Sequence, residues 1–350
     1  MIYDIIGDVH GQANKLIGLL GKLGYQQHFY EQNDEQNDEQ NGITTPYYQP
    51  PVGHHAVFIG DLIDRGKQEV TTLQIAFAMK DAGVADIVIG NHEYNALAYA
   101  TKNQIHHADN ANNAFNAFNA NNIDNHDGGY LRSHSDVHRR QHQAFLAEVP
   151  FGSDAHAYWL SRFYELPLWL ETPHACFVHA CWDTDSMAVL APLLTNDNRL
   201  TPHALQLTGQ KNSIQYDALE RVLKGVETPL PDGLYLLDKD GGKRHNVRVK
   251  WWLDELNNRP IHQIAHAPNF ALASIPIDAI SPPIEFGLKT DKPVFVGHYW
   301  LTGTPKPLSK QVVCVDYSAA SKTGHLTCYQ FDTDNPLPLS ADNFVQYRQD

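Results

Sequence analysis

Short apolar runs recur along the chain, and each one ends at a glycine or at a polar cluster. The runs hold three to five residues and are rich in β-branched side chains. Runs of this length and composition are typical of strands that are buried on both faces of a sheet. The predicted strands are Ile2–Ile6, Ala56–Ile59, Asp86–Ile89, Ala175–Val178, Val294–Val296 and Val312–Val315.

Helical periodicity occupies part of the sequence between these runs. Four leucines in Leu16–Leu23 repeat at helical spacing, and the pattern stops at Gly24, a residue type that often follows a helix C-terminus. A similar apolar pattern covers Leu73–Met79, and residues 140–170 and 200–224 are further helical candidates. Because strands and helices alternate, we predict an α/β fold.

Three segments interrupt this alternation. Residues 31–50 include a Glu-Gln-Asn-Asp repeat and residues 103–127 are rich in Asn and Ala, so we expect both to be flexible insertions. Prolines and the turn-like sequence Asp238–Gly242 predict a β-hairpin or lid over residues 225–260. We expect residues 1–350 to form a single domain around these insertions.

The composition narrows the class of protein. Of the 350 residues, 42% are apolar, which is enough for a large buried core. The 26 basic and 40 acidic residues give a net charge of −14, which argues against nucleic acid as a partner. The chain shows neither a basic leader nor an apolar stretch of membrane-spanning length, so we expect a soluble, cytoplasmic protein with no membrane partner. Its four cysteines lack paired spacing and are expected to be reduced core thiols.

The loops that follow five of the predicted strands carry residue types that bind metals. In open α/β sheets the ligand site lies beyond the carboxyl ends of the strands, so these loops can converge on one place. The residues are Asp8 and His10, Asp61, Asp64 and Arg65, Asn91, His92 and Glu93, His179, and His298. The alternative, in which these side chains only satisfy turn backbones, does not account for histidines at so many strand ends.

Such a mixture of carboxylates and imidazoles suits a pair of adjacent metal ions. A shared carboxylate and a shared hydroxide offset the repulsion between two cations that lie roughly 3.5–4 Å apart. Oxygen and imidazole ligands together favour Mn, Fe or Zn over Ca or Mg. We therefore predict two transition-metal ions, Mn, Fe or Zn, as cofactors.

The order of the loops and the residue types in them resemble the calcineurin-like metallophosphoesterase superfamily. They are most similar to its phosphoprotein-phosphatase branch, which includes Ser/Thr protein phosphatases and bacterial symmetrical diadenosine tetraphosphate hydrolases. The resemblance implies a four-layer αββα sandwich with a dinuclear metal site at the carboxyl ends of the strands.

The resemblance also implies a ligand set. Asp61 would bridge the two ions. The other ligands would be Asp8 and His10 on the first ion and Asn91, His179 and His298 on the second. Trp300 stands where many superfamily members carry a further histidine ligand, so water is expected to complete the first ion.

By the same resemblance, His92 is the general acid that protonates the leaving group, oriented by Asp64, and Arg65 is a clamp on the phosphoryl oxygens. A second phosphate-binding arginine has no fixed spacing in the family, and the candidates are Arg248 and, behind it, Arg244. The competing interpretation of His92 is that it is a metal ligand.

A further group of histidines has two interpretations. His134, His138 and His142 are spaced at i, i+4 and i+8, which would place them on one helix face. They could make an extra metal or phosphate contact. Because no H-E-x-x-H pattern accompanies them, we favour a solvated polar face.

The leading functional hypothesis is a dinuclear-metal phosphoesterase. Its substrate would be a phosphate monoester, on a phosphoprotein or a small phosphorylated molecule, attacked directly by a metal-bridging hydroxide. The alternative is a symmetrical diadenosine tetraphosphate hydrolase, and the least favoured interpretation is a non-catalytic metal-binding scaffold. The sequence leaves the oligomeric state open.

Overall fold

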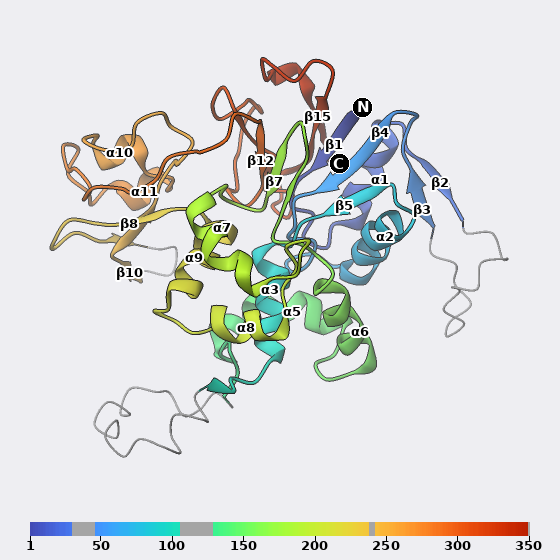
Figure 1. Ribbon diagram of the computed structural model, residues 1–350, viewed down its shortest axis with the longest axis horizontal. Coiled ribbons are helices and arrows are strands. Elements are labelled where there is room, and N and C mark those ends of the chain that lie inside the picture. Colours follow the sequence, from blue (N-terminus) through green and yellow to red (C-terminus); the bar gives the residue numbers. More distant parts are fainter. Residues whose placement is uncertain (30–45, 106–128, 238–241, 349–350) are drawn as a thin grey trace.

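The computed structural model describes residues 1–29, 46–105, 129–237 and 242–348. Most of its strands belong to two sheets, with helices around them (Figure 1). Residues 31–45 and 106–127 of the predicted insertions lie outside the described residues, as do residues 238–241 of the predicted turn.

The larger sheet has the N-terminal strand near its centre. Strand β1 (Ile2–Ile6) pairs in parallel with β4 (His54–Phe58), which pairs in parallel with β5 (Ala85–Ile87). On its other side β1 pairs antiparallel with β15 (His325–Asp332), so the first strand lies beside one from the end of the chain. The sheet is completed by β14 (Asp316–Tyr317) and β16 (Phe344–Tyr347), which both pair with β15.

The smaller sheet is built from the second half of the chain, in the order β13-β12-β7-β6. Strand β12 is parallel to both of its neighbours, whereas β6 is antiparallel to β7. The bounds are β6 (Trp169–Glu171), β7 (Cys176–Val178), β12 (Val294–Val296) and β13 (Val312–Cys314).

The inner faces of the two sheets pack against each other. Ile5 and Val57 of the larger sheet share one apolar cluster with Phe177 and Phe295 of the smaller sheet, and each is at most 1% exposed. Helices cover the outer faces, so the strands are apolar on both sides, as their sequences predict. This layering agrees with the predicted αββα sandwich. The four cysteines are free and buried.

Helices from both halves of the chain cover the sheets. Leucines of α1 (Ala13–Lys22) and α2 (Glu69–Asp81) pack with β1 and β4 of the larger sheet. Helices α7 (Thr184–Leu190) and α9 (Ile214–Lys224) pack together beside β7 (Figure 1). The remaining helices of the described residues are α3 (Asn91–Ala100), α5 (Asp136–Glu148), α6 (Asp154–Phe163), α8 (Pro202–Thr208), α10 (Ile261–Ile264) and α11 (Asn269–Leu272), with short 3-10 turns η2 (Ala191–Leu193) and η3 (Ala341–Asn343). Among the described residues, no helix combines the length and apolar character needed to cross a membrane.

The structure corrects the prediction of helix over residues 140–170. Helix α5 ends at Glu148, shortly before Pro150, which lacks the amide that would continue the helical hydrogen bonds. Helix α6 then begins after Ser153, whose hydroxyl accepts a hydrogen bond from the amide of His156. The end of the region, Trp169–Glu171, is strand β6 rather than helix.

A hairpin nested inside a second antiparallel strand pair occupies the region predicted as a hairpin or lid. Strand β8 (Glu227–Pro229) pairs with β11 (Asn246–Arg248), and β9 (Leu236–Leu237) pairs with β10 (Lys243–Arg244). Their apolar side chains form a separate small core that continues through Ile275, beyond the predicted boundary at residue 260. A further hairpin joins β2 (Gln26–His28) to β3 (Tyr47–Gln49), so the last residues of the predicted insertion 31–50 include a strand.

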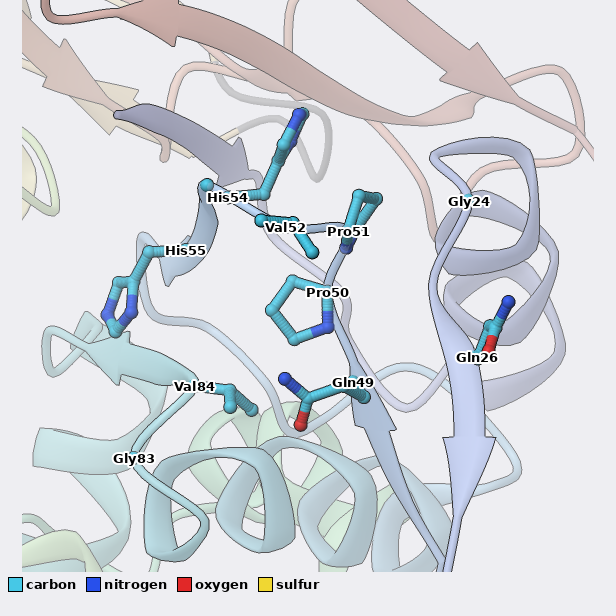
Figure 2. Close-up of a pocket in the computed structure, with 11 residues that line it drawn as sticks. Gly24, Gln26, Gln49, Pro50, Pro51, Val52, His54, His55, Gly83 and Val84 are labelled. Carbon is cyan, nitrogen blue, oxygen red and sulfur yellow. The ribbon is translucent and has the colours of Figure 1, made fainter.

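A surface pocket of about 520 Å³ lies at the amino ends of β4 and β5, opposite to the loops singled out in the sequence (Figure 2). Among its lining residues are His54 and His55, which already pair with Asp4 and Asp86, each at 2.9 Å. Since ligands of open α/β sheets bind beyond the carboxyl ends of the strands, we place the functional site elsewhere.

Candidate metal centre and active site

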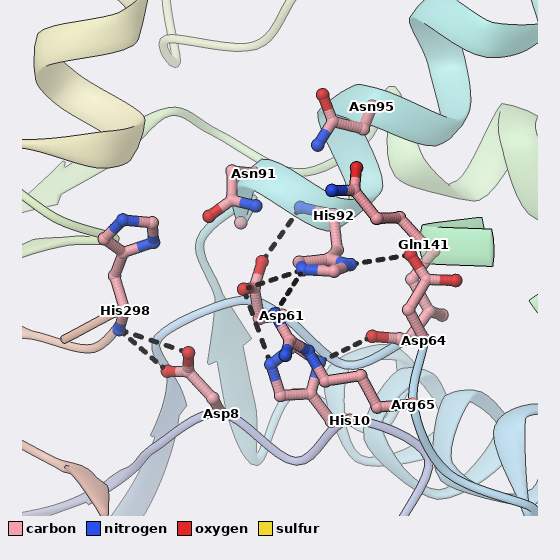
Figure 3. A network of polar contacts seen from close by, with 12 residues as sticks. Asp8, His10, Asp61, Asp64, Arg65, Asn91, His92, Asn95, Gln141 and His298 are labelled. Atoms are coloured by element: carbon pink, nitrogen blue, oxygen red, sulfur yellow. Dashed lines mark hydrogen bonds and ion pairs between the residues drawn. The ribbon is translucent and has the colours of Figure 1, made fainter. Parts of the chain in front are cut away.

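The loops that follow β1, β4 and β5 are tied together through their backbones. The amides of Val9 and His10 both donate to the carbonyl oxygen of Asp61. Gly60 and Gly90 allow the second and third loops to touch, because a Cβ on Gly90 would overlap the backbone of Asp61. Polar side chains of these loops therefore lie close together, as Figure 3 shows.

Several of these residues adopt the left-handed backbone conformation that non-glycine residues rarely occupy. The φ angles are 49° at His10, 50° at Asp61, 69° at Asp64, 77° at Arg65, 70° at His298 and 50° at Trp300. Such conformations persist only where the surrounding structure enforces them, and they concentrate at functional sites. The strained positions coincide with residues that the sequence pattern singles out.

Two groups of buried side chains could each hold a metal ion, and Asp61 belongs to both. The first group is His10, Asp61 and His92, and the second is Asp61, His179 and His298. Within each group the potential ligand atoms lie within 4.8 Å of one another. A carboxylate shared by two groups is the arrangement expected of a bridging ligand.

The hydrogen bonds of the imidazoles fit metal binding. The Nδ1 atoms of His10 and His179 contact backbone carbonyl oxygens at 2.7 and 2.6 Å, which leaves each Nε2 facing Asp61, at 3.7 and 3.4 Å from its carboxylate. The Nε2 atoms of His10 and His298 are buried without a hydrogen-bond partner among the described residues. Metal ions would satisfy these nitrogens, and the carbonyl oxygens that contact the rings of His10 and His179 are the usual support of a histidine ligand.

Asp8 and Asn91 lie in the same network. The carboxylate of Asp8, 1% exposed, accepts a hydrogen bond from the backbone amide of His298 at 3.1 Å. Asn91 is the first residue of α3, and its Oδ1 lies 3.1 Å from Nε2 of His179. The structure therefore brings together all six residues predicted as metal ligands.

Burial and mutual charge shift the pKa values in this cluster. Burial acts to raise the pKa of Asp61, but the charge of His179 and its hydrogen bond hold it well below its ordinary value. Burial acts to lower the pKa of His179, whereas Asp61 raises it to about 10. Burial and the nearby Asp316 raise the pKa of Asp8 well above its ordinary value. Metal binding at this cluster would require His179 to release its proton, because metals bind the neutral imidazole.

His92 makes a short contact with Asp64. Its Nδ1 lies 2.6 Å from Oδ2 of Asp64, and both side chains are buried. Its Nε2 is 3.3 Å from Nη2 of Arg65 and 3.9 Å from Oδ2 of Asp61. The outward nitrogen of His92 therefore faces the candidate metal centre, a position from which it could protonate a leaving group.

Arg65 is held against an aromatic ring. The central carbon of its guanidinium lies 3.7 Å from the centroid of the Trp300 ring, close enough for a cation–π interaction. Trp300 is 38% exposed, and its ring lies 5.9 Å from that of His10. The residue that stands in place of a further histidine ligand thus supports the predicted phosphate clamp.

With this geometry established, sequence comparison decides the family. A model of the calcineurin-like phosphoesterase family matches residues 1–191, more than half of the chain. The chain belongs to the calcineurin-like phosphoesterase family. The resemblance inferred from the loops is confirmed, and the matched span includes Asp8, Asp61, His92 and His179.

Individual relatives match a shorter segment. The asymmetrical bis(5'-nucleosyl)-tetraphosphatase PrpE of Halalkalibacterium halodurans is 35% identical over 92 residues, which are 26% of this chain and 31% of that protein. PrpE of Bacillus subtilis is 30% identical over 105 residues, 30% of this chain and 36% of that protein. The chain therefore spans about a third of the length of these phosphoesterases.

Solved structures match the chain at low sequence identity. A protein serine/threonine phosphatase from Saccharomyces cerevisiae covers 100% of this chain and 80% of its own, with 13% identity and a TM-score of 0.47. A cold-active protein-tyrosine phosphatase of a psychrophilic Shewanella species covers 99% and 80%, with 16% identity and a TM-score of 0.43.

The two arginines predicted to bind phosphate lie in different environments. Arg248 ends β11, pairs with Glu227 at 3.5 Å and keeps its Nε buried without a hydrogen-bond partner among the described residues. Burial, followed by the positive charge of Arg248, holds the pKa of His298 well below its ordinary value, so the charge of this guanidinium acts on a metal-donor residue. Arg244 lies on β10 and is exposed.

Two buried glutamates shape the loops of the phosphoesterase site. The carboxylate of Glu93 accepts hydrogen bonds from the amides of Gly90, Asp61, Leu62 and Ile63, so it joins the second loop to the third. Glu69, the first residue of α2, accepts from the amides of Asp64 and Gly66. The sequence alone does not predict a role for Glu69, because its partners are recognisable only once the loop has folded back on the helix.

Glu69 makes the stability of this loop dependent on pH. Burial, followed by the charge of Asp64, raises the pKa of Glu69 from about 4.5 to about 8. The folded state therefore holds a proton that the unfolded state has released, and the free energy of unfolding falls as pH rises between these values. Glu69→Gln removes this titration. We expect its free energy of unfolding relative to wild type to increase by on the order of 3 kcal/mol between pH 5 and pH 8.

Urea unfolding of both proteins at the two pH values measures this change. A difference between Glu69→Gln and wild type that is the same at pH 5 and pH 8 would contradict the assignment. Glu69→Asp is the matched control, because it keeps a titrating carboxylate at this position.

The prediction for the three histidines was wrong in two respects. Helix α5 begins at Asp136, so His134 precedes the helix and the residues do not share one helical face. His138 contacts Ser133 outside the site, whereas His142 is 4% exposed and lies 3.0 Å from Asp64. The stripe therefore includes a buried neighbour of the active site, which an i, i+4 spacing alone does not reveal.

Proposed function

We propose that this protein is a metal-dependent phosphoesterase that hydrolyses a phosphate monoester, on a phosphoprotein or a small phosphorylated molecule, without a phosphorylated enzyme intermediate. The observation that carries the proposal is the position of Arg65 beside His92, within a site that holds two metal-donor groups sharing Asp61, one of which includes His92. A phosphoryl clamp and a potential acid thus adjoin a centre that could activate water.

The ligand set fits two ions, held by Asp8, His10, Asp61, Asn91, His179 and His298. When bound, a pair of Mn, Fe or Zn ions would activate water as the nucleophile and offset charge on the phosphoryl group. We assign binding of the non-bridging phosphoryl oxygens to Arg65 and Arg248, since guanidinium groups pair with such oxygens through two hydrogen bonds. Trp300 keeps Arg65 in place for this contact.

His92 would protonate the leaving oxygen from Nε2. Its Nδ1 is committed to Asp64, so the ring orientation is fixed and Nε2 is the nitrogen that faces the centre. Asp64 stays ionised, because its hydrogen bonds with His142 and His92 lower its pKa well below the ordinary value, although burial acts in the opposite direction. His92, oriented in this way, would donate a proton to an alkoxide, which is the poor leaving group of a phosphoserine.

Hydrolysis of a dinucleoside tetraphosphate is the second candidate function. It is favoured by the relatives named bis(5'-nucleosyl)-tetraphosphatase, whose matched segments are short. A polyphosphate chain needs more positive charge than a monoester, and the charges of Arg248 and Lys224, which pair with Glu227 and Glu220, both act on His298. The products of dinucleoside tetraphosphate hydrolysis would distinguish symmetrical cleavage, which gives two nucleoside diphosphates, from asymmetrical cleavage, which gives a nucleoside triphosphate and a nucleoside monophosphate.

A substrate panel tests the proposal. Purified protein with measured metal content is assayed on p-nitrophenyl phosphate, phosphoserine and phosphotyrosine peptides, and diadenosine tetraphosphate. We expect the largest kcat/KM on one of the monoesters. A kcat/KM on diadenosine tetraphosphate that exceeds every monoester would instead support the second candidate, and no hydrolysis with any of the three metals would support a non-catalytic metal-binding scaffold.

A further inference from the structure

Asp64 contacts two histidines, one on each carboxylate oxygen. Oδ2 faces Nδ1 of His92 at 2.6 Å, and Oδ1 faces Nδ1 of His142 at 3.0 Å. All three side chains are buried, with 2% exposure at Asp64, 7% at His92 and 4% at His142. The proposed acid is therefore one end of a chain of three groups, and the far end comes from a different helix.

The surroundings of His142 fix its ring and its hydrogen. The ring stacks on Phe145 with centroids 5.2 Å apart and meets the edge of Tyr99 at 5.3 Å. Because Asp64 is ionised and can only accept, Nδ1 of His142 must be the donor. Its Nε2 is buried and has no hydrogen-bond partner among the described residues, so the rest of the ring is held by packing.

The contact with His142 limits the rotation of the Asp64 carboxylate. A carboxylate bound only to His92 could rotate about its last side-chain bond and turn either oxygen toward that imidazole. A donor fixed on Oδ1 removes this freedom and leaves Oδ2 aimed at His92. Groups that orient a reacting imidazole in this way act through geometry, without touching the substrate.

We propose that His142 is a positioning residue, which fixes the Asp64 carboxylate so that His92 presents its outward nitrogen to the leaving group. This inference rests on the proposed acid role of His92. It assigns a role in catalysis to α5, a helix that contributes none of the predicted metal ligands.

Two substitutions of His142 separate positioning from packing. His142→Asn retains an N–H donor attached to the same carbon as in histidine, whereas His142→Leu fills a similar space without a donor. We expect His142→Leu to lower kcat on a phosphoserine peptide by roughly 10- to 100-fold with little change in KM, since it removes a hydrogen bond to a charged group. On p-nitrophenyl phosphate the loss should be smaller, and His142→Asn should recover most of the phosphoserine activity.

His138→Asn is the matched control, since His138 lies one turn earlier on α5 and contacts Ser133 instead of Asp64. Metal content and thermal unfolding are measured for each variant. If His142→Leu does not fold, His142→Gln, which displaces the donor by one carbon, is expected to show the same selective loss. Equal losses on both substrates, no loss, or a His142→Asn that is as impaired as His142→Leu would overturn the proposal.

Assaying His92→Asn in the same series separates the positioning role of His142 from the proposed acid role of His92. If His92→Asn shows the selective loss on phosphoserine and His142→Leu does not, only the role of His142 is overturned. If His92→Asn itself shows no dependence on the leaving group, the acid role fails and the role of His142 fails with it.

Discussion

Asp61→Asn is expected to abolish both metal retention and turnover. Asp61 is the one residue common to the two candidate metal-donor groups among the described residues, and its carboxylate lies 3.4 Å from His179 and 3.7 Å from His10. The substitution replaces a charged oxygen by a neutral amide with almost no change in shape. Because a metal pair supplies several kcal/mol of transition-state stabilisation, turnover should fall by at least roughly 10³-fold.

Elemental analysis and kcat measured on the same preparation check this expectation. Asp86→Asn is the matched control, since Asp86 is an exposed carboxylate on β5 that pairs with His55. We expect the control to bind metal and turn over like wild type. Two metal ions per chain with normal turnover in Asp61→Asn would show that Asp61 does not bridge the ions.

His92→Asn is expected to give the second largest effect, and one that depends on the substrate. If His92 is the acid, turnover of a phosphoserine peptide should fall by roughly 10²–10⁴-fold while both metals and the fold are kept. The loss on p-nitrophenyl phosphate should be smaller, because a phenolate departs without full protonation. Steady-state rates on the two substrates, compared within one preparation, measure the difference.

Asp64→Asn extends the same comparison. It removes the carboxylate that orients His92 but leaves the imidazole, so we expect the same substrate dependence in weaker form. Loss of a metal ion in His92→Asn would contradict the acid role and return His92 to the ligand shell, where its grouping with His10 and Asp61 would place it.

The parts of the structure that the sequence predicts are those with a local signature. Ile2–Ile6 and Val294–Val296 form strands over the predicted residues, because burial on both faces requires an apolar run in the chain itself. The candidate metal centre can also be predicted from the sequence. The loops that carry Asp8, Asp61 and Asn91 follow β1, β4 and β5, so the parallel arrangement of these strands brings them together. His179 and His298 follow β7 and β12, which are parallel neighbours in the smaller sheet.

The parts that the sequence does not predict depend on contacts between distant residues. His142 is 78 positions from Asp64, and its spacing from His138 suggests only a helix face. Strand β15 has a mixed composition over His325–Asp332 and becomes a strand by pairing with β1. The side chain of Glu69 is polar and begins a helix, so nothing near it in sequence indicates that it is fully buried.

The most direct test of the account is the dependence of turnover on bound metal. Hydrolysis of p-nitrophenyl phosphate is measured for protein stripped of metal by chelation, and again after addition of Mn, Fe or Zn, with the metal content of each sample determined by elemental analysis. We predict that the stripped protein is inactive and that turnover returns in proportion to the metal bound at the Asp61 centre. Full turnover in protein verified to be free of metal would contradict the account.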